Sequence, residues 1–259
     1  MADPVPDDLR ALAVALAEEA GALLLEGQPK VRASVETKST GTDMVTEMDR
    51  ASERLIVDGL LAARPDDGIL GEEGSARAGT SGVRWVIDPL DGTTNYLYGF
   101  PSYGVAIGAE VDGAPVAAAV HDPVHGETFS ASLGGGSACN GRALTVTGPP
   151  TLATALVGTG FAYDAARRAA QAEVVRRVVP NVRDLRRAGA AALDLCWVAA
   201  GRLDAFYERG LAPWDWCAAS LVAAEAGLRT QVFDEGGHDL HVAAPPHLFD
   251  DLVALLRDR

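Results

Sequence analysis

The sequence WVIDPLDGTTN at residues 85–95 joins a short apolar run to two carboxylates, a glycine and two hydroxyl side chains. Its first three residues are continuously apolar rather than alternating, which predicts a strand buried inside a sheet. Pro89 and Gly92 are expected to stop this strand, and the turn that follows can aim Asp88 and Asp91 at one point. A polar site is therefore expected directly after a core strand.

Two converging carboxylates repel each other unless a cation separates them. A hard divalent ion such as Mg²⁺ fits the pair, because it takes oxygen ligands and shares its shell with substrate phosphate. Gly92 lets the backbone approach a ligand closely, and if Thr93 begins a helix, its free N–H groups favour an anion. These residues predict the floor of a metal-dependent phosphatase site. The alternative, that Asp-Pro-Leu-Asp-Gly is only a turn with ordinary turn residues, is open at this point.

Length and composition indicate a compact enzyme. The 259 residues allow one large or two small domains, and 48% hydrophobic residues with 28 glycines and 14 prolines are typical of an α/β or α+β fold. The formal charge of −14 argues against a nucleic-acid partner, which requires a basic face. Small phosphorylated substrates stay possible, because bound metal ions reverse the local charge.

The cysteines and the N-terminus indicate a cytoplasmic protein. Cys139, Cys196 and Cys217 are odd in number and far apart, so they are expected to be small buried apolar residues rather than disulfide partners. The first residues are acidic where a secretory signal is basic, and no stretch is apolar enough to span a membrane.

An N-terminal helix is expected to end near Gly27 and Pro29. After a polar loop at residues 38–43, a second helix is expected to carry Asp49 near its start. A carboxylate in a first helical turn is also ordinary helix-dipole chemistry, so Asp49 by itself has a purely structural explanation.

A brief strand at Ile69 and Leu70 ends at Glu72 and Glu73. Successive strand side chains point to opposite sides, so only one of these acids can face a shared site. The alternative is a solvated acidic loop tip. Residues 75–82 are small and polar and are expected to form a mobile loop.

After Pro101 the sequence changes to short apolar runs with Asp-Gly and Asn-Gly turns, which predicts an antiparallel sheet over residues 105–141. In the second half, helices and strands are mixed. Strands are expected at residues 155–158, 204–208 and 228–234, and helices at residues 163–179, 190–200, 213–225 and 245–256. Asp215 stands in the first turn of its helix, where it too has a structural explanation.

Four segments together resemble the inositol monophosphatase family. They are Gly71–Glu73, Trp85–Asn95, Trp214–Ala219 and Asp43–Asp49. The resemblance covers nearly the whole chain, from about residue 38 to the end of the Asp215 helix. It implies an α+β fold, the layered αβαβα sandwich of the inositol monophosphatase and fructose-1,6-bisphosphatase type. It also implies one compact catalytic unit, usually a homodimer, with an antiparallel sheet and most metal ligands in residues 1–148 and substrate-selecting residues in 149–259.

The resemblance assigns roles to the acids. Two Mg²⁺ ions would be held by four carboxylates and a backbone carbonyl, those of Glu72, Asp88, Asp91, Asp215 and Leu90. Asp88 would bridge the ions, and a third, weaker ion would lie near Glu72 with Asp49 close by.

The remaining catalytic roles implied by the resemblance concern the attacking water and the phosphate. Thr93 would pair with Asp49 to orient the water, with Glu72 in the same catalytic set, and the N–H groups of Gly92 and Thr93 would hold phosphate oxygens. Such two-metal hydrolysis requires no nucleophilic Ser or Cys.

Substrate selection is assigned by the resemblance to Gly189, Ala190, Ala191 and Glu208, with a phosphorylated polyol, most readily inositol 1-phosphate, as the substrate. Glu208 would accept hydrogen bonds from ring hydroxyls. Ala190 stands where the family usually has a hydroxyl residue, and Arg187 where it has serine, which weakens the expectation of tight selection for inositol.

Enzymes of the same fold cleave histidinol phosphate, fructose 1,6-bisphosphate or adenosine 3′,5′-bisphosphate. The uncharged Thr94 favours the inositol branch, since histidinol-phosphate enzymes and the nucleotide phosphatases tend to have a basic residue at this position. The inositol branch also implies inhibition by Li⁺. A different class of hypothesis is a non-catalytic regulator that binds a protein or RNA, and the acidic charge and the complete set of acids argue against that as the main role.

Overall fold

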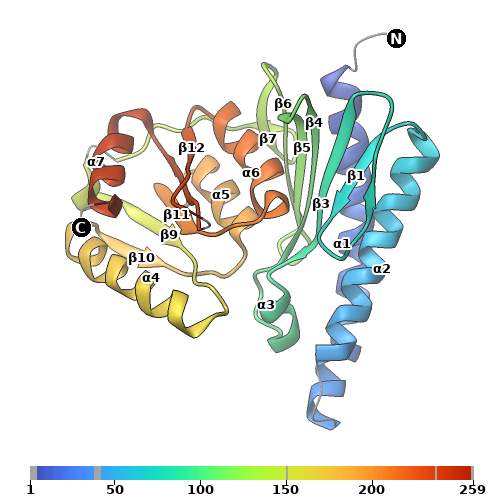
Figure 1. Cartoon of the computed structure of the whole chain (residues 1–259), viewed down its shortest axis with the longest axis horizontal. Helices are drawn as coiled ribbons and strands as arrows, with labels where there is room; N and C mark the ends of the chain where they lie inside the picture. The colour runs from blue at the N-terminus through green and yellow to red at the C-terminus, as the bar shows by residue number, and fades with distance from the viewer. Residues whose placement is uncertain (1–4, 38–41, 150, 237, 258–259) are drawn as a thin grey trace.

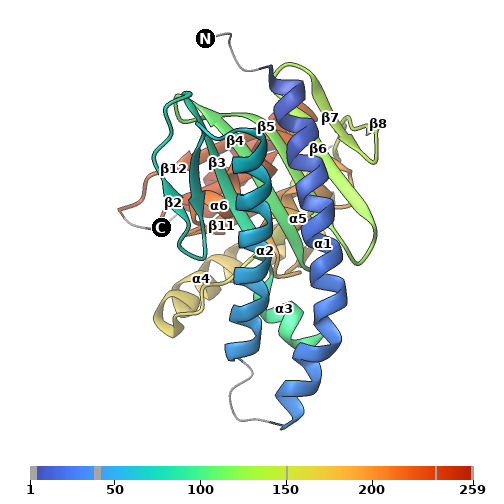
Figure 2. The same cartoon turned by 90° about the vertical axis from the view of Figure 1, so that its right-hand side faces the viewer.

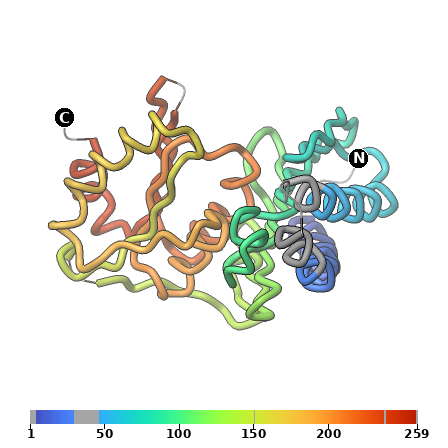
Figure 3. The backbone as a smooth tube through the Cα atoms, turned by 90° about the horizontal axis from the view of Figure 1, so that it is seen from below, coloured from blue at the N-terminus to red at the C-terminus, as the bar shows by residue number. Residues whose placement is uncertain are grey.

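The computed structural model describes the backbone of residues 5–37, 42–149, 151–236 and 238–257 and, except for residues 30–46, their side chains. Most of the polar loop expected at 38–43 lies outside this part. The elements stack in five layers (Figures 1 and 3). In order, these are α1 (Pro6–Thr37) with α2 (Thr42–Ala63), an eight-stranded sheet, α5 (Ala191–Ala199) with α6 (Pro213–Glu225), a five-stranded sheet, and α4 (Ala165–Val178) with α7 (Pro246–Arg257). The αβαβα sandwich is confirmed.

The first sheet carries the stretch that begins the site. Its strands, in spatial order, are β2 (Ala76–Arg77), β1 (Gly68–Gly71), β3 (Val83–Asp91), β4 (Gly104–Val111), β5 (Ala114–Asp122), β6 (Glu127–Ser132), β7 (Gly136–Cys139) and β8 (Arg142–Ala143). The strands from β3 to β8 are antiparallel, as expected, with Asp112 and Asn140 at positive φ in the two turns. β1 runs parallel to β3, which places the ends of both strands at one edge.

The second sheet has the order β10 (Asp184–Arg186), β9 (Leu156–Thr159), β11 (Ala205–Arg209), β13 (Leu240–Ala244) and β12 (Arg229–Phe233). The helices and strands expected in the second half are confirmed, with ends shifted by one or two residues. β10 and β13 were not predicted. β13 is buried at all five positions because it lies between β11 and β12 inside the layered core. Its sequence therefore lacks the alternation of polar and apolar residues from which a strand is predicted.

The sheet bearing the site is buried on both faces. Ile107 and Trp85 pack with side chains of α1 and α2, whereas Ala106 and Val120 pack with α5 and α6. Figure 2 shows α1 and α2 side by side across the outer face of this sheet. β3 is therefore an interior strand, as its continuous apolar run predicts. Within the described residues no helix has the length and apolar character needed to cross a bilayer.

The expectation that the first helix ends near Gly27 and Pro29 is wrong, because α1 continues through both. Gly27 is a contact point: a Cβ there would overlap the side chain of Met48 on α2 and lie 3.1 Å from the hydroxyl of Tyr96. That hydroxyl donates to the carbonyl of Leu24 (2.7 Å). Packing against α2 and α3 (Thr93–Tyr98) thus overrides the local helix-stop residues.

Two other local expectations are corrected by hydrogen bonding. Pro89 does not stop β3. The strand continues to Asp91 with a register shift after Asp88, and a proline fits such an irregular stretch because no ladder donor is required there. Residues 75–82, expected as a loop, contain β2, which pairs with β1 through Ile69 and Leu70.

Candidate active site

The end of β3 forms the floor of the candidate site. Asp88 and Asp91 flank the irregular stretch of the strand and are 1% and 7% exposed. The N–H of Leu90 donates to Oδ1 of Asp88 (3.0 Å), and Oγ of Ser52 on α2 donates to the carbonyl of Pro89 (2.8 Å). These bonds hold the turn in one conformation, so the two carboxylates have a fixed relation to each other.

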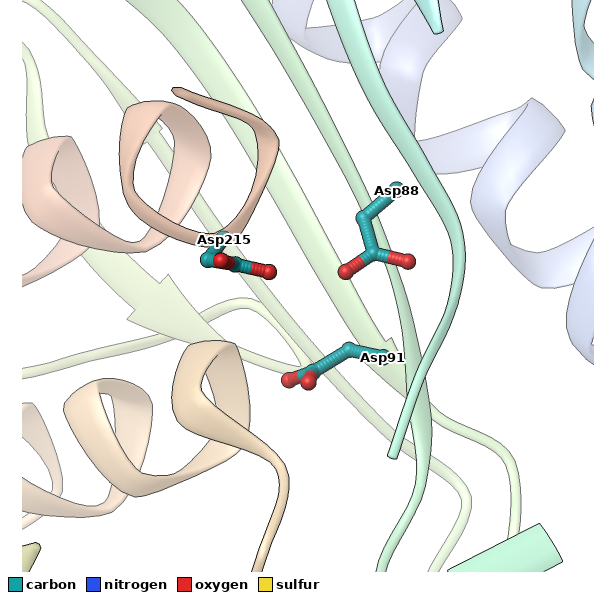
Figure 4. A group of neighbouring side chains, drawn as sticks. All are labelled: Asp88, Asp91 and Asp215. Carbon is teal, nitrogen blue, oxygen red and sulfur yellow. The ribbon is translucent and has the colours of Figure 1, made fainter. Parts of the chain in front are cut away.

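Asp215 completes a group of three carboxylates. It lies in the first turn of α6, after Pro213, and its Oδ2 accepts the N–H of Ala212 (2.7 Å). One oxygen from each of Asp88, Asp91 and Asp215 can be chosen so that all three lie within 4.8 Å of one another. Figure 4 shows the three side chains pointing toward a common centre from β3 and α6. Residues more than a hundred positions apart are therefore brought together, as expected.

The electrostatics of this group favour a bound cation. Burial and then the neighbouring carboxylates of Glu72, Asp91 and Asp215 raise the pKa of Asp88 well above its usual value. Burial and the charge of Asp215 raise the pKa of Asp91 to about 7. All the charged neighbours that act on these two groups are acids. A divalent cation would relieve both the repulsion and the desolvation, so the donor set fits a hard metal ion.

Asp91 also joins the two halves of the molecule. Its Oδ1 accepts the N–H of Ala191 (3.2 Å) and its Oδ2 the N–H of Ala192 (2.7 Å), both in the first turn of α5. A carboxylate at a helix N-terminus is stabilised by the free N–H groups and the helix dipole. The strand that carries Asp91 is thereby fixed to the helix that follows Gly189.

Glu72 is placed at the same edge by a buried acid of α2, Glu53. Glu53 is 3% exposed, and its carboxylate accepts the N–H groups of Glu73 (2.9 Å) and Ser75 (3.0 Å). A Cβ at Gly71 would overlap this carboxylate, so only glycine fits there. Glu72 lines the cleft, while Glu73 is partly buried and interacts with Arg50 (3.6 Å), which confirms that the two acids diverge.

Replacing Glu53 with Ala is expected to lower the free energy of unfolding by about 2 kcal/mol, because two backbone N–H groups lose their acceptor. Divalent-metal affinity should fall as well, since the turn that carries Glu72 is no longer held. Urea unfolding and metal titration by calorimetry would measure both effects. Glu47→Ala, at an exposed position of the same helix, is the control. Equal values for the two variants would contradict the role of Glu53.

Asp49 was expected near the start of its helix, and this prediction is wrong. α2 begins at Thr42, so Asp49 lies about two turns inside it. The side chain is buried, and burial followed by the charges of Glu73 and Glu72 raises its pKa to about 8. Asp49 thus adjoins the Glu72 turn rather than acting as a helix-end carboxylate.

Thr93 begins α3, as expected, and Gly92 precedes it at φ +87°. A Cβ at Gly92 would lie 2.9 Å from the carbonyl oxygen of Ser102, so glycine is required by both conformation and space. Oγ1 of Thr93 donates to the carbonyl of Leu90 (3.1 Å). The expected pairing of Thr93 with Asp49 is absent from the hydrogen bonds of the described residues.

Glu208, on β11, lines the same cleft. Burial, then the charges of Asp215 and Asp91, raise its pKa to about 8. Its carboxylate lies where a Cβ at Gly160 would be, so Gly160 makes room for it. Glu208 therefore belongs to the same electrostatic group as the acids of β3 and α6.

A cleft of about 360 Å³ contains nearly all the residues that the sequence singled out. Its lining includes Glu72, Asp88, Leu90, Asp91, Gly92, Thr93, Gly189, Ala191, Glu208 and Asp215. Asp49 and Ala190 are buried behind it rather than lining it. Ala190 is fully buried as the residue before α5, which leaves no space for a larger side chain without movement.

The sequence interpretation missed Glu53 and two arginines of the cleft, Arg167 on α4 and Arg187 after β10. The four-residue spacing of Asp49 and Glu53 would have placed both on one helix face. Arg187 was noted only as a departure from serine, and nothing local in the sequence distinguishes Arg167 from the other arginines of α4.

The five-layer sandwich with this acidic cleft has the features of a metal-dependent phosphatase. A model of the inositol monophosphatase family matches residues 6–257, and the chain belongs to this family.

Similar proteins carry two kinds of name. The inositol-1-monophosphatase of Mycobacterium leprae is 44% identical over 277 aligned positions, covering 98% of this chain and 95% of the relative. The structure of Mycobacterium tuberculosis SuhB superposes with a TM-score of 0.87 at 45% identity, covering 98% of both chains. A relative from Pseudomonas aeruginosa that is named Nus factor SuhB is 42% identical and covers 83% of this chain and 82% of its own length.

Proposed function

We propose that this chain hydrolyses phosphate monoesters with bound Mg²⁺, and that inositol 1-phosphate is its preferred substrate. The observation that carries the proposal is the convergence of Asp88, Asp91 and Asp215 in one cleft. The name inositol-1-monophosphatase, carried by a relative that is 44% identical over nearly the whole chain, supports the choice of substrate.

The acids of the cleft divide between two ions in this proposal. Glu72, Asp88 and the Leu90 carbonyl would hold one Mg²⁺, and Asp88, Asp91 and Asp215 would hold a second. A weaker third ion would be bound near Glu72, with Asp49 close by. When bound, Mg²⁺ would lower the pKa of a bound water molecule and neutralise negative charge on the phosphate. Asp88, which is buried among the other acids, would be the shared ligand.

The other catalytic residues orient water and phosphate. In the proposal, Thr93 aims the attacking water together with Asp49 and Glu72, and the N–H groups of Gly92 and Thr93 hold phosphate oxygens. The Thr93 hydroxyl already faces the Leu90 carbonyl at 3.1 Å, so it can donate there while accepting from water. Its fixed position reduces the reorganisation needed for an in-line attack.

Phosphate release from inositol 1-phosphate by the purified protein tests the proposal. Release should require Mg²⁺, stop with EDTA and be inhibited by Li⁺. Comparison with histidinol phosphate, fructose 1,6-bisphosphate and adenosine 3′,5′-bisphosphate tests the substrate choice. An absence of Mg²⁺-dependent release from every monoester would refute the proposed activity and leave a binding role, in line with the name Nus factor carried by one relative.

The substrate alcohol is proposed to contact Glu208 and the backbone of Gly189, Ala190 and Ala191. At pH 9, above the pKa of about 8, replacing Glu208 with Gln is expected to raise KM for inositol 1-phosphate about 10- to 100-fold, because a hydrogen bond to a carboxylate contributes about 1.5–3 kcal/mol. Steady-state kinetics with p-nitrophenyl phosphate, which has no polyol, provides the control. A similar loss on both substrates would contradict a contact between Glu208 and the polyol.

We also propose that the enzyme is a homodimer, as the family resemblance implies. Size-exclusion chromatography with light scattering would measure the mass directly, against a chain mass of 26.9 kDa.

A further inference from the structure

A second hollow, of about 460 Å³, lies where the ends of α4, β11 and α7 meet (Figure 1). Its lining, which we call the basic hollow, consists of Arg177, Arg209, Asp234, Glu235, Gly236, Leu256 and Arg257. Three arginines from distant parts of the sequence therefore meet here against two acids. Such an excess of cations is unexpected in a chain of net charge −14.

The strand β11 separates the basic hollow from the active-site cleft. Phe206 packs among side chains of α5 and α6, whereas Tyr207 packs among those of α4 and α7. Because side chains alternate along a strand, Glu208 faces the cleft and Arg209 faces the hollow. The guanidinium of Arg209 pairs there with Glu235. The hollow is thus a separate site on the other face of the sheet.

One carboxylate serves two of the three arginines. Glu235 pairs with Arg209 and, at 3.2 Å, with Nε of Arg257. Among the residues that the structure describes, no acid pairs with Arg177, whose Nη2 donates to the carbonyl of Leu256 (3.2 Å). Nε of Arg177 is buried and has no acceptor within the same residues. A buried N–H of a charged group normally has an acceptor, so an oxygen from a ligand would complete this arrangement.

Helix capping explains only part of the cluster. Arginines near the end of a helix stabilise its last carbonyl groups, and both Arg177 and Arg209 donate to the carbonyl of Leu256, at 3.2 and 3.5 Å. Capping does not relieve the repulsion between the arginines themselves. Burial, followed by the charges of Arg177 and Arg257, lowers the pKa of Arg209. A bound anion would remove this repulsion, as a cation would for the acids of the cleft.

We propose that the basic hollow binds an anion that carries a phosphate group, held by Arg177, Arg209 and Arg257. Guanidinium groups match phosphate geometry, because they donate two parallel hydrogen bonds to its oxygens. The volume of about 460 Å³ is in the range of small-molecule sites, so the hollow has room for a small phosphate ester as well as for free phosphate. This binding does not depend on the proposed catalytic activity.

Calorimetry on the metal-free, full-length protein in EDTA measures the binding of inorganic phosphate. Without cations the acidic cleft should repel phosphate, so the hollow is expected to bind one phosphate per chain with a Kd of about 1 mM or lower. Arg177→Gln and Arg257→Gln should each weaken binding about tenfold or more, because each removes charge-assisted hydrogen bonds. Arg176→Gln, at an exposed position of α4, and Arg187→Gln, in the cleft, remove the same charge outside the hollow and should leave the affinity unchanged.

A parallel titration with glycerol 3-phosphate distinguishes two sources of the phosphate group. Tighter binding of glycerol 3-phosphate than of inorganic phosphate would identify the ligand as a phosphorylated metabolite. Tighter binding of inorganic phosphate would identify it as the free ion. Either result supports the site, provided that Arg177→Gln weakens it.

Thermal unfolding covers the case in which Arg177→Gln lowers stability, since Arg177 also contacts Leu256. In EDTA, phosphate at about ten times its Kd should raise the Tm of the unmodified protein and of Arg176→Gln, but not that of Arg177→Gln. Two results would overturn the inference: no saturable binding of phosphate in EDTA, or binding that is lost in Arg187→Gln and kept in Arg177→Gln. The second result would place the anion in the cleft. A failure to detect phosphatase activity would refute the proposed function and leave the binding result unaffected.

Discussion

Asp91→Asn is expected to lower kcat for inositol 1-phosphate by about 10³-fold, which corresponds to about 4 kcal/mol of lost transition-state stabilisation. Asp91 lies among the three converging carboxylates, and a neutral amide oxygen is a much weaker ligand for a hard cation. The side chain keeps its size, but the amide nitrogen cannot accept an N–H group, so only one of the two hydrogen bonds from Ala191 and Ala192 is kept. Phosphate release at saturating Mg²⁺ measures the change, and calorimetry shows whether one fewer metal ion is bound.

The control for this variant is Asp194→Asn. Asp194 is 1% exposed on α5, and burial, followed by the charge of Asp91, raises its pKa well above the usual value. An amide matches the size and shape of this carboxyl group, and Asp194 does not line the cleft. We expect kcat to change less than about threefold in this control, because no ligand is lost. Equal activity of Asp91→Asn and the unmodified protein would refute the assignment of the metal site.

The local parts of the site could be predicted from the sequence. Asp88 and Asp91 lie in one short stretch, so strand and turn preferences were enough to suggest that they converge. Asp215 is more than a hundred residues away, and only the family resemblance connected it to them. The structure confirms that the three approach one another, with Asp91 also fixed by the start of α5.

The errors arose where contacts between distant segments outweigh local preference. Gly27 and Pro29 are helix-stop residues, yet α1 continues because α2 and Tyr96 pack against it. Pro89 is accommodated in β3 by a register shift that the sequence does not mark.

The surroundings of Glu53, Arg167 and Arg187 could not be predicted, because they are formed by segments distant in sequence. Glu53 faces the backbone N–H groups after β1. The two arginines face a cleft built from both halves of the chain.

The metal-free protein is expected to lose stability as the pH rises from about 5 to 8. Four acids of the site have pKa values above their usual range: Asp49 and Glu208 at about 8, and Glu72 and Asp91 at about 7. Burial is the main cause in each case. In the unfolded chain these groups release their protons near pH 4. Between that pH and about 8 the folded state holds more protons than the unfolded state, so the free energy of unfolding falls as pH rises.

Fewer groups have the opposite effect, in which stability rises with pH. Burial lowers the pKa of His121 and His241, which favours the folded state as pH rises through about 6.5. Since two histidines oppose at least four acids, the net effect expected is a decrease in stability with pH. A bound divalent cation reverses this decrease, because it binds the deprotonated acids of the folded state and has no comparable site in the unfolded chain.

Thermal unfolding in EDTA should therefore give a lower Tm at pH 8 than at pH 5.5, and adding Mg²⁺ should raise Tm more at pH 8 than at pH 5.5. A change of 1 kcal/mol shifts Tm by about 2–4 °C in a chain of this size, so the effect is measurable. Asp91→Asn removes one of the acids and should reduce the difference between the two pH values. If Tm in EDTA were equal or higher at pH 8, the acids would be paired with cations of the protein itself. In that case the cleft would not need a metal ion to stabilise the charges that Asp88, Asp91 and Asp215 bring together.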